Sequence, residues 1–203
     1  LLAPLMGMAL GMFSLLVILR LFRHSIPASV DHLFRRGQLI SAAAYSLGHG
    51  TNDAQKTMGI IAGALFTVPA YRYLVSDMEG QLTIPFWIVL LAHAAIGLGT
   101  LSGGWRIVRT MGSRITRLQP IGGFAAEAAG AITLFGAAHF GIQVSTTHTI
   151  PGAIGGVGSV RRLRSVRWNV AGRIVWAWIL TIPASSLLAM LFWFIIDWLR
   201  KLV

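Results

Sequence analysis

Long apolar runs are the feature that most limits what this chain of 203 residues can fold into. Residues 1–19, 84–104, 120–140 and 172–198 each come close to the ~20 residues with which an α-helix crosses the hydrocarbon core of a bilayer. Only 11% of the residues are charged, against about a quarter in a soluble domain. Because the runs are continuous and do not alternate, a β-barrel is disfavoured. The sequence therefore predicts an all-α, polytopic transmembrane helical bundle.

The basic residues are concentrated in three short segments between the apolar runs. They are Arg20, Arg23, Arg35 and Arg36; Arg106, Arg109, Arg114 and Arg117; and Arg161, Arg162, Arg164 and Arg167. The segment 68–83 has one arginine against two acids. Cytoplasmic loops of membrane proteins are enriched in arginine, so this asymmetry predicts that the three basic segments lie inside and 68–83 outside. It also accounts for the net charge of +11 without nucleic acid as a partner.

A polar segment, residues 46–56, interrupts the apolar stretch 39–67 and contains Asn52, Asp53 and Lys56. Ionisable residues inside a membrane are costly and usually functional. We expect Gly48 and Gly50 to break the helix just before Asp53 and to expose backbone groups there. The structural alternative is an internal ion pair, because Lys56 follows Asp53 by one helical turn.

A second polar segment, residues 141–152, continues into a glycine-rich run that ends at residue 158. Glycine and proline at this density predict a broken or re-entrant stretch over 141–160 that lines a cavity. Ser145, Thr146 and Thr147 can present hydroxyls and helix N-terminal N–H groups to a tetrahedral oxyanion. Alternatively, these hydroxyls bond back to carbonyls of their own helix.

Three further ionisable residues are candidates for carrying a proton or a cation. Glu127 stands alone in an alanine- and glycine-rich span, where it either acts as such a carrier, pairs with an arginine or holds two helices together. His49 and His148 lie inside the two polar segments, as proton relays or as fixed hydrogen-bonding groups. Cysteine is absent and the histidines lack ligand spacing, so we expect no metal site and no cofactor. The sequence also lacks HExxH, Walker and GxSxG motifs, so an enzyme is not predicted.

The two polar segments together resemble the signatures of the inorganic phosphate transporter (Pit, or phosphate permease) family. The matching segments are Gly48-His49-Gly50-Thr51-Asn52-Asp53-Ala54-Gln55-Lys56 and Gln143-Val144-Ser145-Thr146-Thr147-His148-Thr149, with further similarity at residues 104–112, 122–127, 166–170 and 178–183. The resemblance implies a symporter built from inverted repeats with phosphate bound between them. It implies phosphate and ion ligands at Asn52, Asp53, Ser145, Thr146 and Thr147, with Thr51 and Gly48 as weaker candidates. The residue types themselves make Asp53, Glu127, His49 and His148 the candidate coupling groups.

The chain departs from the family pattern in two ways. An earlier Gly-Ala-Asn-Asp copy is missing, so the chain resembles the C-terminal repeat with its preceding span. We expect residues 1–203 to form one transporter domain, a fragment that is completed by the absent N-terminal repeat, a second chain or a homodimer. Sodium-coupled members have a glutamate near the segment 106–110, where this chain has Arg109. Proton symport, with phosphate carried as a neutral metal complex, therefore stays open beside Na⁺ symport.

The resemblance implies a multi-pass protein of the bacterial inner membrane, surrounded by lipid. Three alternative functions remain at this stage. A sulfate permease would have the same fold. An intramembrane hydrolase would use Asp53 with His49 or His148. A non-transporting membrane subunit would account for the half-length chain.

Overall fold

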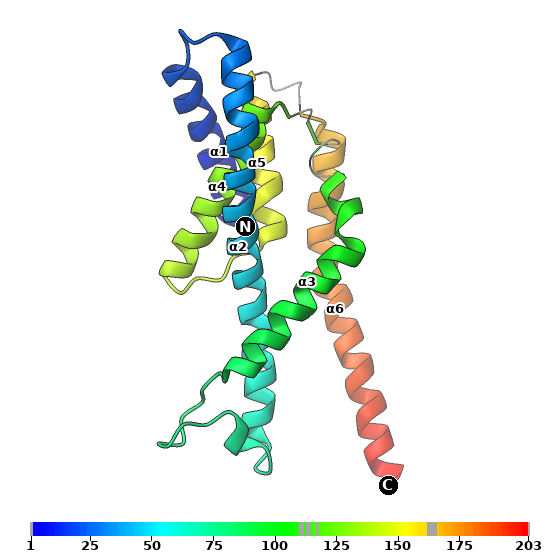
Figure 1. Cartoon of the computed structure of the whole chain (residues 1–203). Helices are drawn as coiled ribbons and strands as arrows, with labels where there is room; N and C mark the ends of the chain where they lie inside the picture. The colour runs from blue at the N-terminus through cyan, green and yellow to red at the C-terminus, as the bar shows by residue number, and fades with distance from the viewer. Residues whose placement is uncertain (1, 110–111, 113–114, 117, 162–165, 203) are drawn as a thin grey trace. The chain divides into compact units, whose positions relative to one another are not determined.

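The computed structural model describes residues 2–109, 112, 115–116, 118–161 and 166–202. Its elements are α1 (Leu2–Leu21), α2 (Pro27–Thr67), the 3-10 turn η1 (Arg72–Leu74), α3 (Phe86–Arg109), α4 (Pro120–His139), α5 (Thr146–Arg161) and α6 (Trp168–Leu202) (Figure 1). The described residues form no β-strand beyond a single bridge between Ser76 and Leu82. Helices α1, α3, α4 and α6 are long and apolar enough to cross a membrane. The predicted all-α membrane fold is confirmed, while Arg114, Arg117, Arg162 and Arg164 lie outside the described residues.

Helix α2 has 41 residues, which corresponds to about 60 Å, or roughly twice the thickness of a hydrocarbon core. It begins at Pro27, whose fixed φ suits the first helical turn, and follows Ile26 in an extended conformation. The first basic segment, which was expected between two spans, is therefore largely helical, because Arg35 and Arg36 already lie within α2.

The expected helix break at Gly48 and Gly50 is wrong, because α2 runs through both residues. Gly48 is buried, and a Cβ atom placed there would touch the side chain of Leu134 on α4. A glycine inside a helix costs about 1 kcal/mol relative to alanine. At Gly48 this cost is offset by the close approach of α4, so the glycine serves packing here rather than helix termination.

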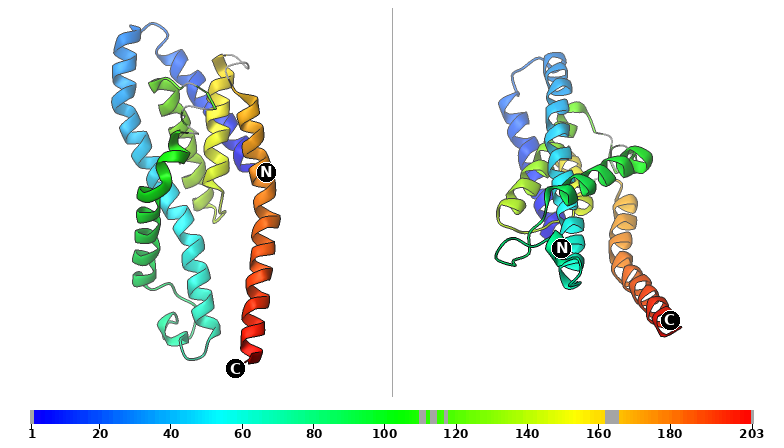
Figure 2. Two further views of the ribbon diagram at one scale, coloured as in Figure 1. Left: turned by 90° about the vertical axis from the view of Figure 1, so that its right-hand side faces the viewer. Right: turned by 60° about the horizontal axis from the view of Figure 1, so that its bottom comes forward.

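Helices α1 and α5 pack against each other through reciprocal glycines (Figure 2). Gly7 and Gly11 on α1 are four residues apart, as are Gly152 and Gly156 on α5. A Cβ atom added to Gly7 would strike the Thr149 carbonyl, and the other three glycines face the backbone of the opposite helix in the same way. This small-xxx-small arrangement lets two membrane helices come into backbone contact. The position of α5 is thereby fixed by α1.

Helices α4 and α5 form a helical hairpin. Its turn, residues 140–145, contains Gly141 at φ +67°, in the left-handed region that favours glycine. With 16 residues, α5 is only about 24 Å long, too short to cross a hydrocarbon core alone. The break expected over 141–160 is confined to this turn, because α5 runs continuously from Thr146 through Pro151 to Arg161. The turn lies beside the middle of α2 (Figure 1).

The second half of α2 packs against α3 and the loop that joins them. Their shared apolar core consists of Ala54, Met58, Ala62, Val75, Ile88 and Ala92. The α2 residues of this core begin at Ala54, directly after Asp53. The part of α2 that follows the polar segment therefore packs against α3. This packing fixes the position of α2 independently of the hairpin.

The described residues from Arg167 onward form a second compact unit. Helix α6 continues through Pro183 and has no fully buried residue among those described. Its exposed side chains are mostly large and apolar, and they include Trp168, Trp176, Trp193 and Trp198. Such a surface is typical of a helix in contact with lipid, with tryptophans near its ends.

Candidate functional site

One face of α2 carries a row of polar side chains, which we call the polar stripe. Its members are Gln38, Ser41, Tyr45, His49, Asn52, Asp53 and Lys56. Spacings of three and four residues place them on one side of a helix. This side faces α4 and the hairpin turn, as shown by the contacts of Ser41 with Glu127 and of Asn52 with Val144. The polar stripe therefore faces α4 and the hairpin turn and is not turned toward lipid.

Asn52 connects α2 to the hairpin turn. Its side chain is buried, and its Nδ2 donates a hydrogen bond to the Val144 carbonyl at 2.7 Å. The same nitrogen lies 3.2 Å from Oδ1 of Asp53. A buried amide and a main-chain carbonyl both need partners, and each supplies one to the other. Asn52 thereby fixes the height of the hairpin turn along α2.

Asp53 is the residue at which the two polar segments meet. Its Oδ1 accepts a hydrogen bond from Lys56 Nζ at 3.3 Å, and its Oδ2 accepts one from the Thr146 hydroxyl at 3.3 Å. His49 Nδ1 lies 3.7 Å from the same Oδ2. The Asp53–Lys56 ion pair is thus formed, but it is one part of a larger cluster that includes α5.

The predicted hydroxyl triplet lies at the start of α5, where Ser145 is the last residue of the turn and Thr146 and Thr147 are the first residues of the helix. The Thr146 side chain is buried toward Asp53, while the hydroxyls of Ser145 and Thr147 lie 2.9 Å apart on the more accessible side. Thr149 bonds back to the Ser145 carbonyl, so the alternative of an intrahelical hydrogen bond applies to Thr149 and not to Thr146. Two hydroxyls and a helix N-terminus therefore point away from the protein core beside Asp53.

The remaining predicted site residues are Thr51, His148 and Glu127. Thr51 turns its hydroxyl to the Leu47 and Gly48 carbonyls of its own helix. His148, half-buried in α5, lies within electrostatic reach of Lys56. Glu127 accepts a hydrogen bond from Ser41 at 2.6 Å, and Ser41 precedes Asp53 by twelve residues, or about 18 Å along α2. The structure brings Glu127 onto the polar stripe but not into the Asp53 cluster.

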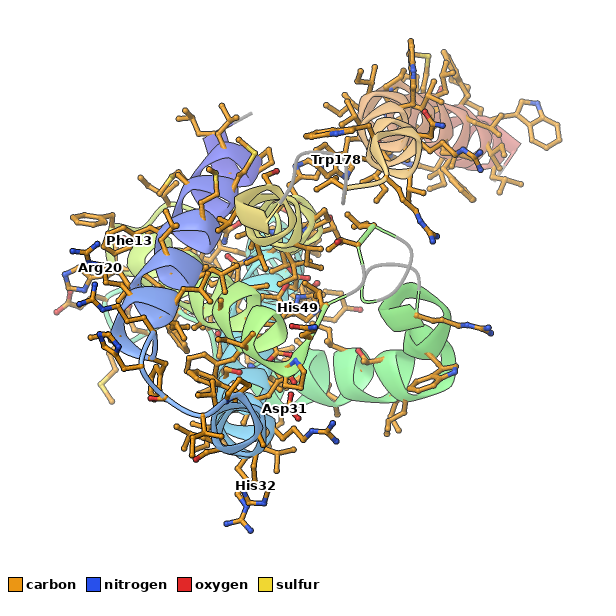
Figure 3. The ribbon with its side chains drawn as sticks, turned by 90° about the horizontal axis from the view of Figure 1, so that it is seen from above. Phe13, Arg20, Asp31, His32, His49 and Trp178 are labelled. Carbon is orange, nitrogen blue, oxygen red and sulfur yellow. The ribbon has the colours of Figure 1, made fainter. Side chains whose placement is uncertain are left out.

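Two contributors to the site were missed at the sequence level. The Val144 main-chain carbonyl accepts from both Asn52 and Lys56, and a backbone acceptor has no residue-type signature. The Tyr45 hydroxyl donates to the Thr146 carbonyl at 3.5 Å, and its ring stacks on His49. The signal for Tyr45 was its position one helical turn before His49. Figure 3 places His49 toward the centre of the helices, whereas His32 and Arg20 point outward.

The electrostatic character of the cluster suits an oxyanion. Lys56, the Asn52 amide and the Thr146 hydroxyl donate hydrogen bonds to Asp53, and the Ser145 and Thr147 hydroxyls lie next to Thr146 at the N-terminus of α5. Among the described residues, no group of three or more histidines, aspartates or glutamates is placed to hold a metal ion. Fold and site together define a polytopic α-helical membrane protein in which polar residues of α2, the hairpin turn and α5 meet around Asp53.

Comparison with known proteins identifies the family. Residues 22–189 match the model of the phosphate transporter family, PHO4, and the chain belongs to this family. It is 54% identical over 195 residues to a probable low-affinity inorganic phosphate transporter of Rhizobium meliloti (strain 1021), covering 96% of this chain and 56% of that protein. A protein of the same description from Bacillus subtilis (strain 168) is 38% identical over 196 residues, covering 97% of this chain and 57% of that protein.

A solved structure described as the sodium-dependent phosphate transporter superposes with a TM-score of 0.66 at 30% identity. The match covers 82% of this chain and 41% of that one. The chain therefore spans about half the length of the relatives that it matches. The family resemblance of the two polar segments is confirmed, and the relatives are transporters rather than enzymes.

Proposed function

We propose that this chain forms one half of a secondary transporter that moves inorganic phosphate across the bacterial inner membrane together with H⁺ or Na⁺. The observation that carries the proposal is the meeting of Asp53 with Thr146, which joins the two polar segments beside the first turn of α5. The family assignment and the names of the relatives support phosphate as the transported ion. Mechanistically, alternating access would expose this cluster to one side of the membrane at a time.

In the proposed binding mode, phosphate lies against the accessible side of the α5 N-terminus. Its oxygens accept hydrogen bonds from the Ser145 and Thr147 hydroxyls and from main-chain N–H groups of the first helical turn. Lys56 supplies a positive charge on the neighbouring face of α2. Asp53, which is about one-third exposed, accepts a hydrogen bond from the proton that phosphate retains at neutral pH.

Asp53 also gives a reason to favour phosphate over sulfate, the alternative substrate for the same fold. Sulfate has no proton to donate at neutral pH, so a carboxylate in contact with it would be left unpaired and repelled. A site that hydrogen-bonds one ligand discriminates strongly against a ligand lacking that group. The geometry does not favour the hydrolase alternative, because the hydroxyl in contact with Asp53, that of Thr146, is buried and is therefore not presented to a substrate as a nucleophile.

The cluster has the position expected of a transport site. Asp53 follows Pro27 by 26 residues and precedes Thr67 by 14, so α2 extends about 39 Å to one side and about 21 Å to the other. A site between the ends of its helices can be reached from both sides in turn. The hairpin is a candidate for the moving element, because Asn52, Lys56, Tyr45 and Thr146 hold its turn by hydrogen bonds that can be broken and remade.

The other half of the site would come from a second repeat or a second copy of the chain, because the relatives are about twice as long. The proposed coupling groups are Asp53 and His49 on the polar stripe and His148 on α5. Glu127 on α4 is a separate coupling group, whose partner Ser41 lies about 18 Å along α2 from Asp53. Phosphate carried as a neutral metal complex would use the same hydroxyls.

Uptake of labelled phosphate into proteoliposomes containing the full-length protein tests the proposal. We expect uptake by the wild type, loss of at least about tenfold on Asp53→Asn, and little change on Asp31→Asn, an exposed carboxylate paired with Arg35 on the same helix. Excess unlabelled sulfate should compete poorly. Unchanged uptake in Asp53→Asn would overturn the role of Asp53, and equal competition by sulfate would overturn the assignment of the substrate.

A further inference from the structure

We propose that the Lys56 ammonium occupies the place of a bound coupling cation in this half of the site, so that the half-site does not bind Na⁺. The inference rests on the proposed phosphate symport and deepens it by assigning the source of one positive charge. It is carried by the geometry around Nζ, by the choice of lysine at this position and by the charge balance of the cluster.

The Lys56 ammonium is held by oxygen atoms from two separate elements. Nζ lies 3.3 Å from Asp53 Oδ1 on α2 and 3.3 Å from the Val144 carbonyl in the hairpin turn. A carboxylate and a main-chain carbonyl are the oxygen ligands that hard cations take in proteins. Asn52 Nδ2 donates to the same two oxygens, at 3.2 and 2.7 Å, and fixes them beside each other. The ammonium thus fills a two-oxygen cation position.

An ordinary helix-stabilising ion pair does not explain this arrangement. A pair at i,i+3 stabilises a helix only slightly, and it needs no partner outside the helix. Lys201 and Asp197 form such a pair within α6, at 2.8 Å and i,i+4. Lys56 instead reaches across to the hairpin turn, where it donates to the Val144 carbonyl, two residues before α5 begins. The Lys56 ammonium therefore lies between the Asp53 carboxylate and the hairpin turn, next to the proposed position of the phosphate.

The residue type agrees with this function. The chain has 17 lysines and arginines together, and all but Lys56 and Lys201 are arginines. An ammonium is a compact point charge with rotatable donors, whereas a guanidinium is a wide planar group. Only the ammonium resembles a monovalent metal ion in size and in its nearly spherical charge. In a chain that otherwise uses arginine, lysine stands at the one basic position within the polar stripe.

The charge balance of the cluster requires a cation near Asp53. Phosphate brings negative charge to a site that already holds a carboxylate, and an unpaired carboxylate in such surroundings is costly. Lys56 neutralises Asp53 without any dissolved ion. Removal of the lysine charge should leave Asp53 Oδ1 and the Val144 carbonyl without a cation, and Na⁺ is the abundant ion that fits them.

Equilibrium binding of ²²Na⁺ to the purified full-length protein tests the inference. We expect Lys56→Asn to bind one more Na⁺ per chain than the wild type, and Lys201→Asn to bind the same number as the wild type. Uptake of labelled phosphate by Lys56→Asn should become stimulated by Na⁺ by about tenfold relative to its uptake in choline. Equal Na⁺ binding by the wild type and a folded Lys56→Asn variant would overturn the inference.

A second measurement does not depend on the folding of a variant. In a structure of the wild-type protein determined in saturating Na⁺, the Lys56 ammonium should remain beside Asp53 Oδ1 with no ion bound to that oxygen. A Na⁺ ion on Asp53 Oδ1 would overturn the inference. If the wild type takes up no phosphate, the proposed function fails, while Na⁺ binding still decides the role of Lys56.

Discussion

The side-chain amide of Asn52 and the main-chain carbonyl of Val144 are joined by a hydrogen bond of 2.7 Å between α2 and the α4–α5 turn. Asn52 is 92 residues away from Val144 in sequence, and its side chain is buried. The bond therefore has no competition from water. It holds the two polar segments in register, so that Thr146, two residues after Val144, reaches Asp53, one residue after Asn52.

Replacement of Asn52 by alanine should release the hairpin turn from α2. The Val144 carbonyl then keeps only its 3.3 Å contact with Lys56, and the loss of one hydrogen bond costs about 0.5–1.5 kcal/mol, so we expect phosphate affinity in the full-length protein to fall by about two- to tenfold. Binding of labelled phosphate to purified protein measures this. The matched control is Gln55→Ala, an exposed amide on the same helix, which should bind as the wild type does. Equal affinities of the two variants would show that the Asn52–Val144 bond does not organise the site.

Replacement of Thr146 by valine should weaken phosphate binding with little change in packing, because the two side chains have the same shape. The variant loses the hydroxyl that donates to Asp53 Oδ2, so we expect a loss of about five- to tenfold in affinity. Thr133→Val is the control, because Thr133 is equally buried but bonds to the Ala129 carbonyl of its own helix. A similar loss of affinity in both variants would point to general destabilisation instead of a contact at the site.

Alanine at Gly7 or Gly152 should separate α1 from α5. An added methyl group at either position meets backbone of the opposite helix, and overpacking of this kind costs about 1–3 kcal/mol. We expect a lower midpoint of thermal unfolding in detergent, together with weaker phosphate binding. At Gly99 in α3 an added methyl group meets nothing within 4 Å, so Gly99→Ala should be neutral or slightly stabilising through its better helix propensity. A Gly7→Ala variant as stable as Gly99→Ala would contradict the close packing.

Replacement of Glu127 by glutamine separates packing from coupling. The amide oxygen can still accept the Ser41 hydrogen bond, so folding and phosphate affinity should be close to those of the wild type. If Glu127 is a coupling group, uptake driven by a cation gradient should fall by at least about tenfold while counterflow exchange of phosphate continues. A variant with unchanged driven uptake would restrict Glu127 to holding α2 and α4 together.

The sequence was most informative where composition and motif agreed. Apolar runs predicted the helices α1, α3, α4 and α6, and the clustering of Ser145, Thr146 and Thr147 before a glycine-rich helix predicted a helix N-terminus. The local Asp53–Lys56 pair also followed from spacing alone. These predictions depend on properties of neighbouring residues, which a sequence displays directly.

Predictions that depended on packing between distant segments were less successful. Gly48 was expected to end a helix, but the contact with Leu134 gives it a packing role that cannot be recognised before α4 is placed. The reciprocal glycines of α1 and α5 have a readable i,i+4 spacing, yet their pairing depends on the fold. The role of the Val144 carbonyl could not be predicted for a different reason, because every residue has a main-chain carbonyl.

Chemical labelling of a single cysteine at Ser145 tests most directly that the two polar segments enclose a phosphate site. In a cysteine-free form of the full-length protein, Ser145→Cys should react with a small charged thiol reagent, and phosphate should slow the reaction at least about tenfold, with sulfate much less effective. Gln81→Cys, exposed in the loop between α2 and α3, should react at the same rate with and without phosphate. Equal labelling of Ser145→Cys in the presence and absence of phosphate, in protein that still takes up phosphate, would contradict the assignment of the site.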